Sequence, residues 1–290
     1  MKFLSGSYEQ RLSKKYEVLS EKLRQAGDYV AANPLEVATR SLRAVATESG
    51  LAPATYSRLA RALEYDSFED LREVMRRKIS RREDSFATRA ERLRHDHRAG
   101  NAGFFEAHLA ACQNNLRDLA RDIDQNALEQ AVDALLKARK VLLFGALGST
   151  GVVEYLSYMA DFCQPNWTLA GRAGASLGSA LTALQPGDGI LIVTKPPFAP
   201  KSINAARLAR EKGAYVVVIT DTHACPALRY ASAGFIVPTN SPHFYSSYVG
   251  TMFLMEAMIG ILVGRLGPDG SDRIAAVEQS HRQLNEVWDG

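Results

Sequence analysis

Cysteine is scarce in this sequence, and its placement matches no disulfide framework or metal site. Cys112, Cys163 and Cys225 are far apart, and each stands in an apolar context. We therefore expect reduced thiols in hydrophobic cores rather than disulfide partners or ligands. Structural disulfides belong mainly to oxidising compartments, so their expected absence favours a cytoplasmic protein and predicts no metal centre.

A long uninterrupted apolar run is also missing. The most apolar stretch, residues 248–266, is broken by Glu256 and three glycines. A membrane-spanning helix needs about 20 predominantly apolar residues, and the first residues of the chain lack the apolar core of a signal peptide. The sequence thus predicts neither a membrane span nor a membrane partner.

The chain as a whole has no strong excess of charge, but its charge is unevenly spread. Of 290 residues with a net charge of +3, the first hundred hold 20 Lys and Arg against 15 Asp and Glu, and 15 of these basic residues are arginine. The remaining residues are slightly acidic. This pattern suits a module for a polyanion joined to a second module, although a merely solvated basic surface explains the charge equally well.

The first third of the chain has helical periodicity. Apolar residues recur every three or four positions over 8–32, and Pro34 ends that run. Ser67, with Asp70 three residues later, has the pattern of a helix cap and predicts a helix to about Lys78. Residues 1–82 are therefore expected to form an all-α domain.

Residues 41–63 predict a helix-turn-helix: a short helix, a turn at Gly50 and a second helix opening at Pro53. Small residues at Ala46 and Gly50 would let the two helices cross closely. The first turns of such a second helix contact bases and phosphates. We expect it to expose Thr55, Tyr56, Arg58 and Arg61 and to bury Ala54 and Leu59. The predicted contacts to double-stranded operator DNA are Ser41, Thr55, Tyr56, Ser57, Arg58 and Arg61. The alternative is a helical hairpin with no role in DNA binding.

Residues 83–103 are polar and end in glycine, which is typical of an interdomain linker, in part helical. Beyond them, apolar runs at 141–144, 189–194, 214–220 and 234–238, with a weaker one at 167–170, alternate with amphipathic helical stretches. Continuous apolar strands separated by helices indicate a parallel sheet covered on both faces. We predict a doubly wound, mostly parallel, five-stranded α/β domain over 104–290.

Two loops of this domain carry candidate ligand-binding groups. The first joins a strand to a helix and contains Gly145, Gly148, Ser149 and Thr150, whose glycines and hydroxyls suit an anion at a helix N-terminus. A plain strand-to-helix turn is the alternative. The loop lacks both the third glycine of the dinucleotide fingerprint and the lysine of a nucleotide P-loop, so no cofactor is predicted.

The second loop, residues 194–202, contributes Thr194, Lys195 and Ser202 as ligand candidates. Ligands of open α/β sheets bind at the carboxyl ends of the strands, where both loops are expected. Ser202 has a simpler role as the cap of its helix. His243, just before the last long apolar helix, is the remaining candidate, or else a turn residue.

Together these features resemble the RpiR-type (MurR/RpiR) bacterial transcriptional regulators. The resemblance is carried by residues 41–63 with Arg58, by Phe68-Glu-Asp-Leu71, by the loop 144–149, and by residues 205–214, 218–221 and 225–228. It implies an N-terminal helix-turn-helix domain and a C-terminal sugar isomerase (SIS) domain that senses a phosphosugar. Exposed helical material at 104–138 and 271–287 suggests a homo-oligomer, either a dimer or a tetramer.

The second loop departs from the family, whose members usually carry a serine-rich phosphate cradle there. Prolines at 196, 197 and 200 remove three backbone donors. The effector is therefore expected to be an unusual phosphosugar, a sugar acid or a molecule without phosphate.

Two other functions fit the same sequence. A SIS-type sugar-phosphate isomerase would need a base in its pocket, for which Glu154, His223 and His243 are the candidates; each has a simpler role on the surface or in a turn, and no enzyme is predicted. A SIS-containing regulator that no longer binds a ligand is the third reading.

Overall fold

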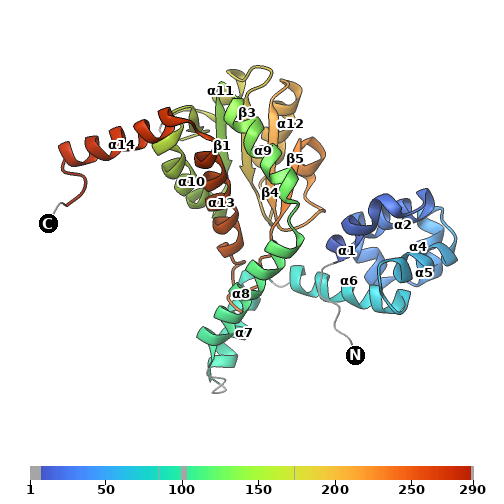
Figure 1. The fold of residues 1–290 in the computed structure, drawn as a ribbon. Coiled ribbons are helices and arrows are strands. Elements are labelled where there is room, and N and C mark those ends of the chain that lie inside the picture. Colours follow the sequence, from blue (N-terminus) through green and yellow to red (C-terminus); the bar gives the residue numbers. More distant parts are fainter. Residues whose placement is uncertain (1–7, 84, 99–102, 173, 289–290) are drawn as a thin grey trace. The chain divides into compact units, whose positions relative to one another are not determined.

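The computed structural model describes residues 8–83, 85–98, 103–172 and 174–288 (Figure 1). The chain divides into two compact units. The helical unit comprises Met1–Ala111 and Asn240–Ser246, and the α/β unit comprises Cys112–Thr239 and Ser247–Gly290. The polypeptide therefore leaves the α/β unit after Thr239 and returns to it at Ser247.

The helical unit is built from short helices, as its periodicity predicts. Their bounds are α1 Tyr8–Lys15, η1 Tyr16–Val18, α2 Glu21–Ala32, α3 Pro34–Thr39, α4 Leu42–Ser49, α5 Pro53–Ala62, α6 Phe68–Glu83, α7 Phe86–Arg98 and α8 Phe104–Asp122, which continues into the α/β unit. The expectation of one helix over 8–32 is wrong, because Leu19 is extended with φ −75° and ψ 142°. Leu19 is nevertheless buried, so the apolar spacing persists across the break.

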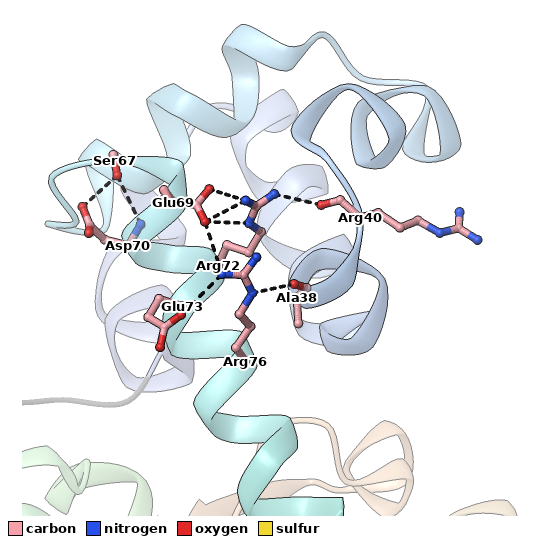
Figure 2. Close-up of polar contacts among 8 residues, drawn as sticks. All are labelled: Ala38, Arg40, Ser67, Glu69, Asp70, Arg72, Glu73 and Arg76. Carbon is pink, nitrogen blue, oxygen red and sulfur yellow. Dashed lines mark hydrogen bonds and ion pairs between the residues drawn. The ribbon is translucent and has the colours of Figure 1, made fainter.

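Helix α6 is held on α3 by a cluster of arginines (Figure 2). Arg72 donates to the carbonyl of Arg40 at 3.1 Å, and Arg76 donates to the carbonyl of Ala38 at 3.0 Å. The Glu69 carboxylate accepts from both guanidinium groups. These bonds satisfy the last carbonyls of α3, which have no partner within their own helix.

The start of α6 has the cap that the sequence predicts. The Ser67 hydroxyl accepts from the Asp70 amide at 3.2 Å and donates to the Asp70 carboxylate at 2.8 Å (Figure 2). Serine at this position satisfies an amide that has no helical acceptor. The helix runs to Glu83, beyond the expected end at about Lys78.

The α/β unit is a five-stranded sheet in the order β2-β1-β3-β4-β5, with every neighbouring pair parallel. The strands are β1 Val141–Gly145, β2 Trp167–Leu169, β3 Gly189–Val193, β4 Tyr215–Thr220 and β5 Ala233–Ile236. Between and around them lie α9 Gln125–Lys137, η2 Leu147–Ser149, α10 Thr150–Cys163, α11 Leu177–Thr182, α12 Pro200–Glu211, η3 Pro226–Tyr230, α13 Val249–Arg265 and α14 Pro268–Gln283.

Each face of the sheet has its own apolar core, because alternate strand residues point to opposite sides. Leu143 and Val217 pack on one side against residues of α9, α10 and α13. Leu142 and Val218 pack on the other side against α11, α12 and η3. Both β1 and β3 are buried at every position. The predicted fold class, an all-α region followed by a doubly wound α/β domain, is confirmed.

The expected linker, 83–103, contains helix α7. Residues 84 and 99–102 of that linker, and 1–7 of the first expected domain, lie outside the described residues. The expected domain limits of 1–82, 83–103 and 104–290 stay predictions, beside compact units that divide between Ala111 and Cys112.

Within the described ranges no single helix is long and apolar enough to cross a membrane. The helix Val249–Arg265 meets that test only jointly with Gly270–Gln283, a pair bent by 116°.

Candidate DNA-binding and effector sites

Helix α4 is bounded by two residues with clear roles. Ser41 precedes it, and the Ser41 hydroxyl accepts from the Ala44 amide at 3.3 Å. Gly50 ends it in the left-handed region, with φ 68°. A Cβ on Gly50 would meet nothing within 4 Å. The glycine is thus needed for its backbone conformation and not, as expected, for close crossing of the two helices.

Helix α5 presents a different face from the expected one. Thr55 and Tyr56 are 2% and 0% exposed, so the expectation that they point outward is wrong, as is the expectation that Ala54 is buried. The Tyr56 ring packs edge-on against the rings of Tyr29 and Phe68, with centroids 6.3 and 5.8 Å away. A large ring gains more from burial in this core than a small alanine does.

The exposed face of α5 carries guanidinium groups. Arg58 and Arg61 are exposed, and Ser57 is half-buried beside them. With Ala54 they follow the three- and four-residue spacing of one helix face. Among the described residues, the one hydrogen bond of the Arg58 side chain is a long contact of 3.4 Å from Nε to the Ala54 carbonyl. Of the six residues predicted to contact DNA, Ser41, Ser57, Arg58 and Arg61 are therefore at the surface, while Thr55 and Tyr56 support the helix from within.

The second candidate site lies at the carboxyl end of the sheet. Strands β1 and β3 are neighbours, with Gly145 in register with Val193, and the strand order reverses direction between them. That point is where open α/β sheets bind ligands. The loops that follow β1 and β3 are the two loops chosen from the sequence, and they leave the sheet at the same edge.

The first loop makes a sharp turn that brings the backbone of Ser149 close to Gly145. A Cβ on Gly145 would lie 2.5 Å from the Ser149 carbonyl oxygen, so glycine is required there. Leu147 has φ 55°, a conformation uncommon outside glycine. Gly148 is exposed and Thr150 half-buried, whereas Ser149 is buried and its hydroxyl lies 3.0 Å from the hydroxyl of Tyr248.

The second loop begins with a buried amine. Thr194 and Lys195 are 3% and 6% exposed. Lys195 Nζ donates to the Thr251 hydroxyl at 2.7 Å and to the Ser247 carbonyl at 3.4 Å. It lies 3.9 Å from the centre of the Tyr248 ring. Burial lowers the pKa of Lys195 to about 7, against a smaller opposing effect of the Asp221 carboxylate.

Ser202 has a different place from its expected one. Helix α12 begins at Pro200 with Ala199 as its cap, so Ser202 lies inside the first turn and does not cap the helix. Its side chain is fully buried, and its hydroxyl has no hydrogen-bond partner among the described residues. Proline's fixed φ explains the early start. A buried hydroxyl without a partner costs about 1–3 kcal/mol.

Tyr248 contacts residues of both loops, but it is not among the ligand-binding residues predicted from the sequence. It directly precedes α13 and contacts both Ser149 and Lys195. No motif marks it, because its partners are about 50 and 100 positions away. Its role follows only from the fold.

Comparison with known proteins identifies the domain to which the α/β unit corresponds. Residues 134–260 match the SIS domain model. The chain contains a SIS domain. A transcriptional regulator of the helix-turn-helix type from Haemophilus influenzae is 20% identical over 98% of this chain and 97% of its own length. The regulator HexR of Escherichia coli is 23% identical over 73% of this chain and 71% of its own.

Solved structures agree in fold. The Vibrio vulnificus NanR protein, solved in complex with ManNAc-6P, has a TM-score of 0.56 at 21% identity, covering 96% of this chain and 99% of that one. The sugar isomerase domain of an RpiR transcription factor from Sphaerobacter thermophilus has a TM-score of 0.54 at 22% identity, covering 62% and 97%. The resemblance to RpiR-type regulators is confirmed.

His243 lies in the segment Asn240–Ser246, which the chain inserts between two parts of the SIS domain and which belongs to the helical unit. Its Nδ1 accepts from the Tyr245 amide at 3.1 Å, and its ring lies 6.2 Å from that of Phe104. The neighbouring Tyr245 ring is 4.9 Å from the ring of Phe86 on α7. The segment is therefore an aromatic contact of the helical unit.

Two of the three candidate bases of an isomerase, Glu154 and His223, are on the surface of the SIS domain. Glu154 is exposed and paired with Arg172 at 3.1 Å, and His223 is exposed. Across the described residues, no three His, Cys, Asp or Glu side chains group to hold a metal ion. Cys163 and Cys225 are buried thiols, whereas Cys112 is half-buried.

Proposed function

We propose that this chain is a DNA-binding transcriptional regulator whose SIS domain senses a small carbohydrate-derived effector. The observation that carries the proposal is the pairing of an exposed arginine face on α5 with a SIS domain whose two ligand loops converge at one sheet edge. Relatives that span most of the chain are named transcriptional regulators.

The DNA-binding part of the proposal rests on α5. Arg58 and Arg61 would contact phosphates or guanine edges, with Ser57 beside them and Ser41 at the start of α4. Arginine suits both kinds of contact because its fork of donors binds two acceptors at once. In a homodimer, two copies of α5 would enter successive major grooves about 34 Å apart.

The effector part of the proposal rests on the two loops. Gly145, Gly148, Ser149 and Thr150 would approach the ligand from β1, and Thr194, Lys195 and Ser202 from β3. The effector is a sugar phosphate or a sugar acid; NanR, which shares the fold, was solved with ManNAc-6P. No cofactor is needed for such a sensor, and its place of action is the cytoplasm, where the DNA is.

The signal would leave the SIS domain through the segment Asn240–Ser246. Both of its flanks contact residues of the site: Thr239 bonds the Asp221 carboxylate at 3.3 Å, and the Ser247 carbonyl accepts from Lys195. The segment itself packs on α7 of the helical unit through Phe86. A ligand that binds two arrangements of these flanks unequally shifts the balance between them.

The test is fluorescence anisotropy of the full chain with labelled DNA from upstream of its own gene, at stated salt. We expect tighter binding to this DNA than to a shuffled sequence, and a change of affinity with at least one compound from a panel of sugar phosphates and sugar acids. Equal affinity for both DNAs would refute the regulator. Specific DNA binding that no compound changes would refute the sensor alone.

A further inference from the structure

Two groups of opposite charge, Lys195 and Asp221, interact at the effector site. Lys195 supplies a buried amine, and Asp221 follows β4 at the same sheet edge and acts electrostatically on it. Tyr248, the Thr251 hydroxyl and the Ser247 carbonyl also contact Lys195. A ligand that displaces Tyr248 therefore meets the Lys195 amine, which can carry a positive charge, and the Asp221 carboxylate, which repels negative charge.

The backbone of the second loop is poor in donors. Prolines at 196, 197 and 200 have no N–H group. A phosphate monoester carries a charge of about −1.5 to −2 at pH 7 and three strong acceptor oxygens. One amine beside a carboxylate compensates that charge incompletely. A carboxylate has one negative charge and two oxygens, and it matches a single ammonium with one or two hydroxyl donors.

We propose that the effector is recognised through a carboxylate group, which binds the Lys195 amine in place of Tyr248 and Thr251. The ligand is accordingly an aldonic, uronic or related polyhydroxy acid, not a sugar phosphate. The inference rests on the proposed sensing function and narrows its ligand class.

The hydroxyls of Ser149 and Ser202 favour this replacement of Tyr248 by the ligand. Ser149 bonds the hydroxyl of Tyr248, so displacement of Tyr248 frees both the amine and a serine from the first loop. Ser202 lies buried at the start of α12 with no partner in the part of the chain that the structure describes. A ligand oxygen would give that hydroxyl a partner and recover the cost of its burial.

The experiment is isothermal titration of the full chain with D-gluconate, D-galactonate and D-glucuronate, against D-glucose 6-phosphate and D-fructose 6-phosphate. We expect at least one carboxylate to bind at least tenfold more tightly than either phosphate. Titration at pH 8 in buffers of different ionisation enthalpy should reveal proton uptake, because the bound anion restores the charge of Lys195.

Variants separate a direct role from a structural one. K195M should lower carboxylate affinity at least tenfold and abolish proton uptake, whereas K201M, which removes an exposed lysine of the same loop, should change neither. S202A should lower affinity severalfold without lowering the melting temperature, because the Ser202 hydroxyl has no hydrogen-bond partner among the described residues. That variant keeps the test decisive if K195M does not fold.

The outcomes are distinct. Binding of a phosphate with no binding of the carboxylates overturns the carboxylate inference and leaves the sensor intact. Carboxylate binding that K195M and S202A leave unchanged also overturns it. If none of the five compounds binds, the carboxylate inference fails; the sensor fails as well if the broader panel leaves specific DNA binding unchanged.

Discussion

Replacing Lys195 by methionine should change how the stability of the α/β unit depends on pH. In the folded chain burial lowers the pKa of Lys195 to about 7, whereas an unfolded lysine has a pKa of about 10.4. Between these values the unfolded state binds more protons than the folded state, so this group makes the free energy of unfolding rise with pH. Below about pH 7 both states are protonated, and the contribution no longer changes.

The size of this rise in the free energy of unfolding follows from the difference between the folded and unfolded pKa values of Lys195. Between pH 7 and pH 9 the folded amine loses its proton while the unfolded amine keeps it, which raises the free energy of unfolding by about 2 kcal/mol. K195M lacks the group and should lack this rise. The difference between wild type and variant isolates Lys195, because the other titrating groups are common to both.

Urea-induced unfolding at pH 7, 8 and 9 measures the effect. Trp167 is buried on β2 and reports unfolding of the α/β unit, while Trp288 is exposed throughout. K201M serves as the control, since it replaces an exposed lysine close to Lys195 in the chain. A difference between wild type and K195M that stays constant with pH would refute the buried, neutralised amine.

Two further substitutions test the tight turn at Gly145 and the role of Phe86 in coupling effector binding to DNA binding. G145A should destabilise the chain by about 1–3 kcal/mol in thermal unfolding, because its Cβ would lie 2.5 Å from the Ser149 carbonyl. G151A is the matched control: a Cβ there meets nothing within 4 Å, and the added helix propensity should leave stability unchanged or up to about 1 kcal/mol higher; equal losses would contradict the tight turn. F86A should weaken the effect of a bound effector on DNA affinity while leaving effector affinity within twofold, whereas F105A, a change of a largely exposed ring, should not. Unchanged coupling in F86A would exclude the route through segment 240–246.

The sheet and its ligand edge were predictable because their signals are local. Buried parallel strands are continuous apolar runs, and parallel strands direct the loops after their carboxyl ends to one edge of the sheet. The strand order, which makes β1 and β3 neighbours, is known from the structure. The capping serine of α6 was equally predictable, because its partner is three residues away.

The orientation of α5 was not predicted correctly, although its sequence contains the necessary signal. Counting by helical period from the buried Leu59 and Leu63 places Ala54, Ser57, Arg58 and Arg61 together on the outer face. Thr55 and Tyr56 fall on the inner face by the same count, although hydroxyl and aromatic side chains can also contact DNA from an outer face. The Tyr56 ring packs against Phe68. The local pattern places Tyr56 on the inner face but does not identify this tertiary contact.

The partners of Lys195 were beyond local reasoning. Tyr248 and Thr251 lie more than 50 positions from it along the chain, and only the closure of the sheet brings them to its amine. The same holds for segment 240–246, which the sequence gives no reason to assign to the helical unit. Such long-range neighbours depend on the complete fold.

The salt dependence of operator binding tests whether α5 contacts DNA. The full chain and its R58A variant are titrated with DNA from upstream of the gene over 50–200 mM KCl. We expect the logarithm of the affinity to fall linearly with the logarithm of the salt concentration. We expect R58A to lose about 1–3 kcal/mol of binding free energy or about one unit of the salt slope. R207A, which removes a half-buried arginine of α12 that is paired with Glu211, should bind as the wild type does. Binding that is absent, independent of salt, or equal in wild type and R58A would contradict a contact between α5 and DNA.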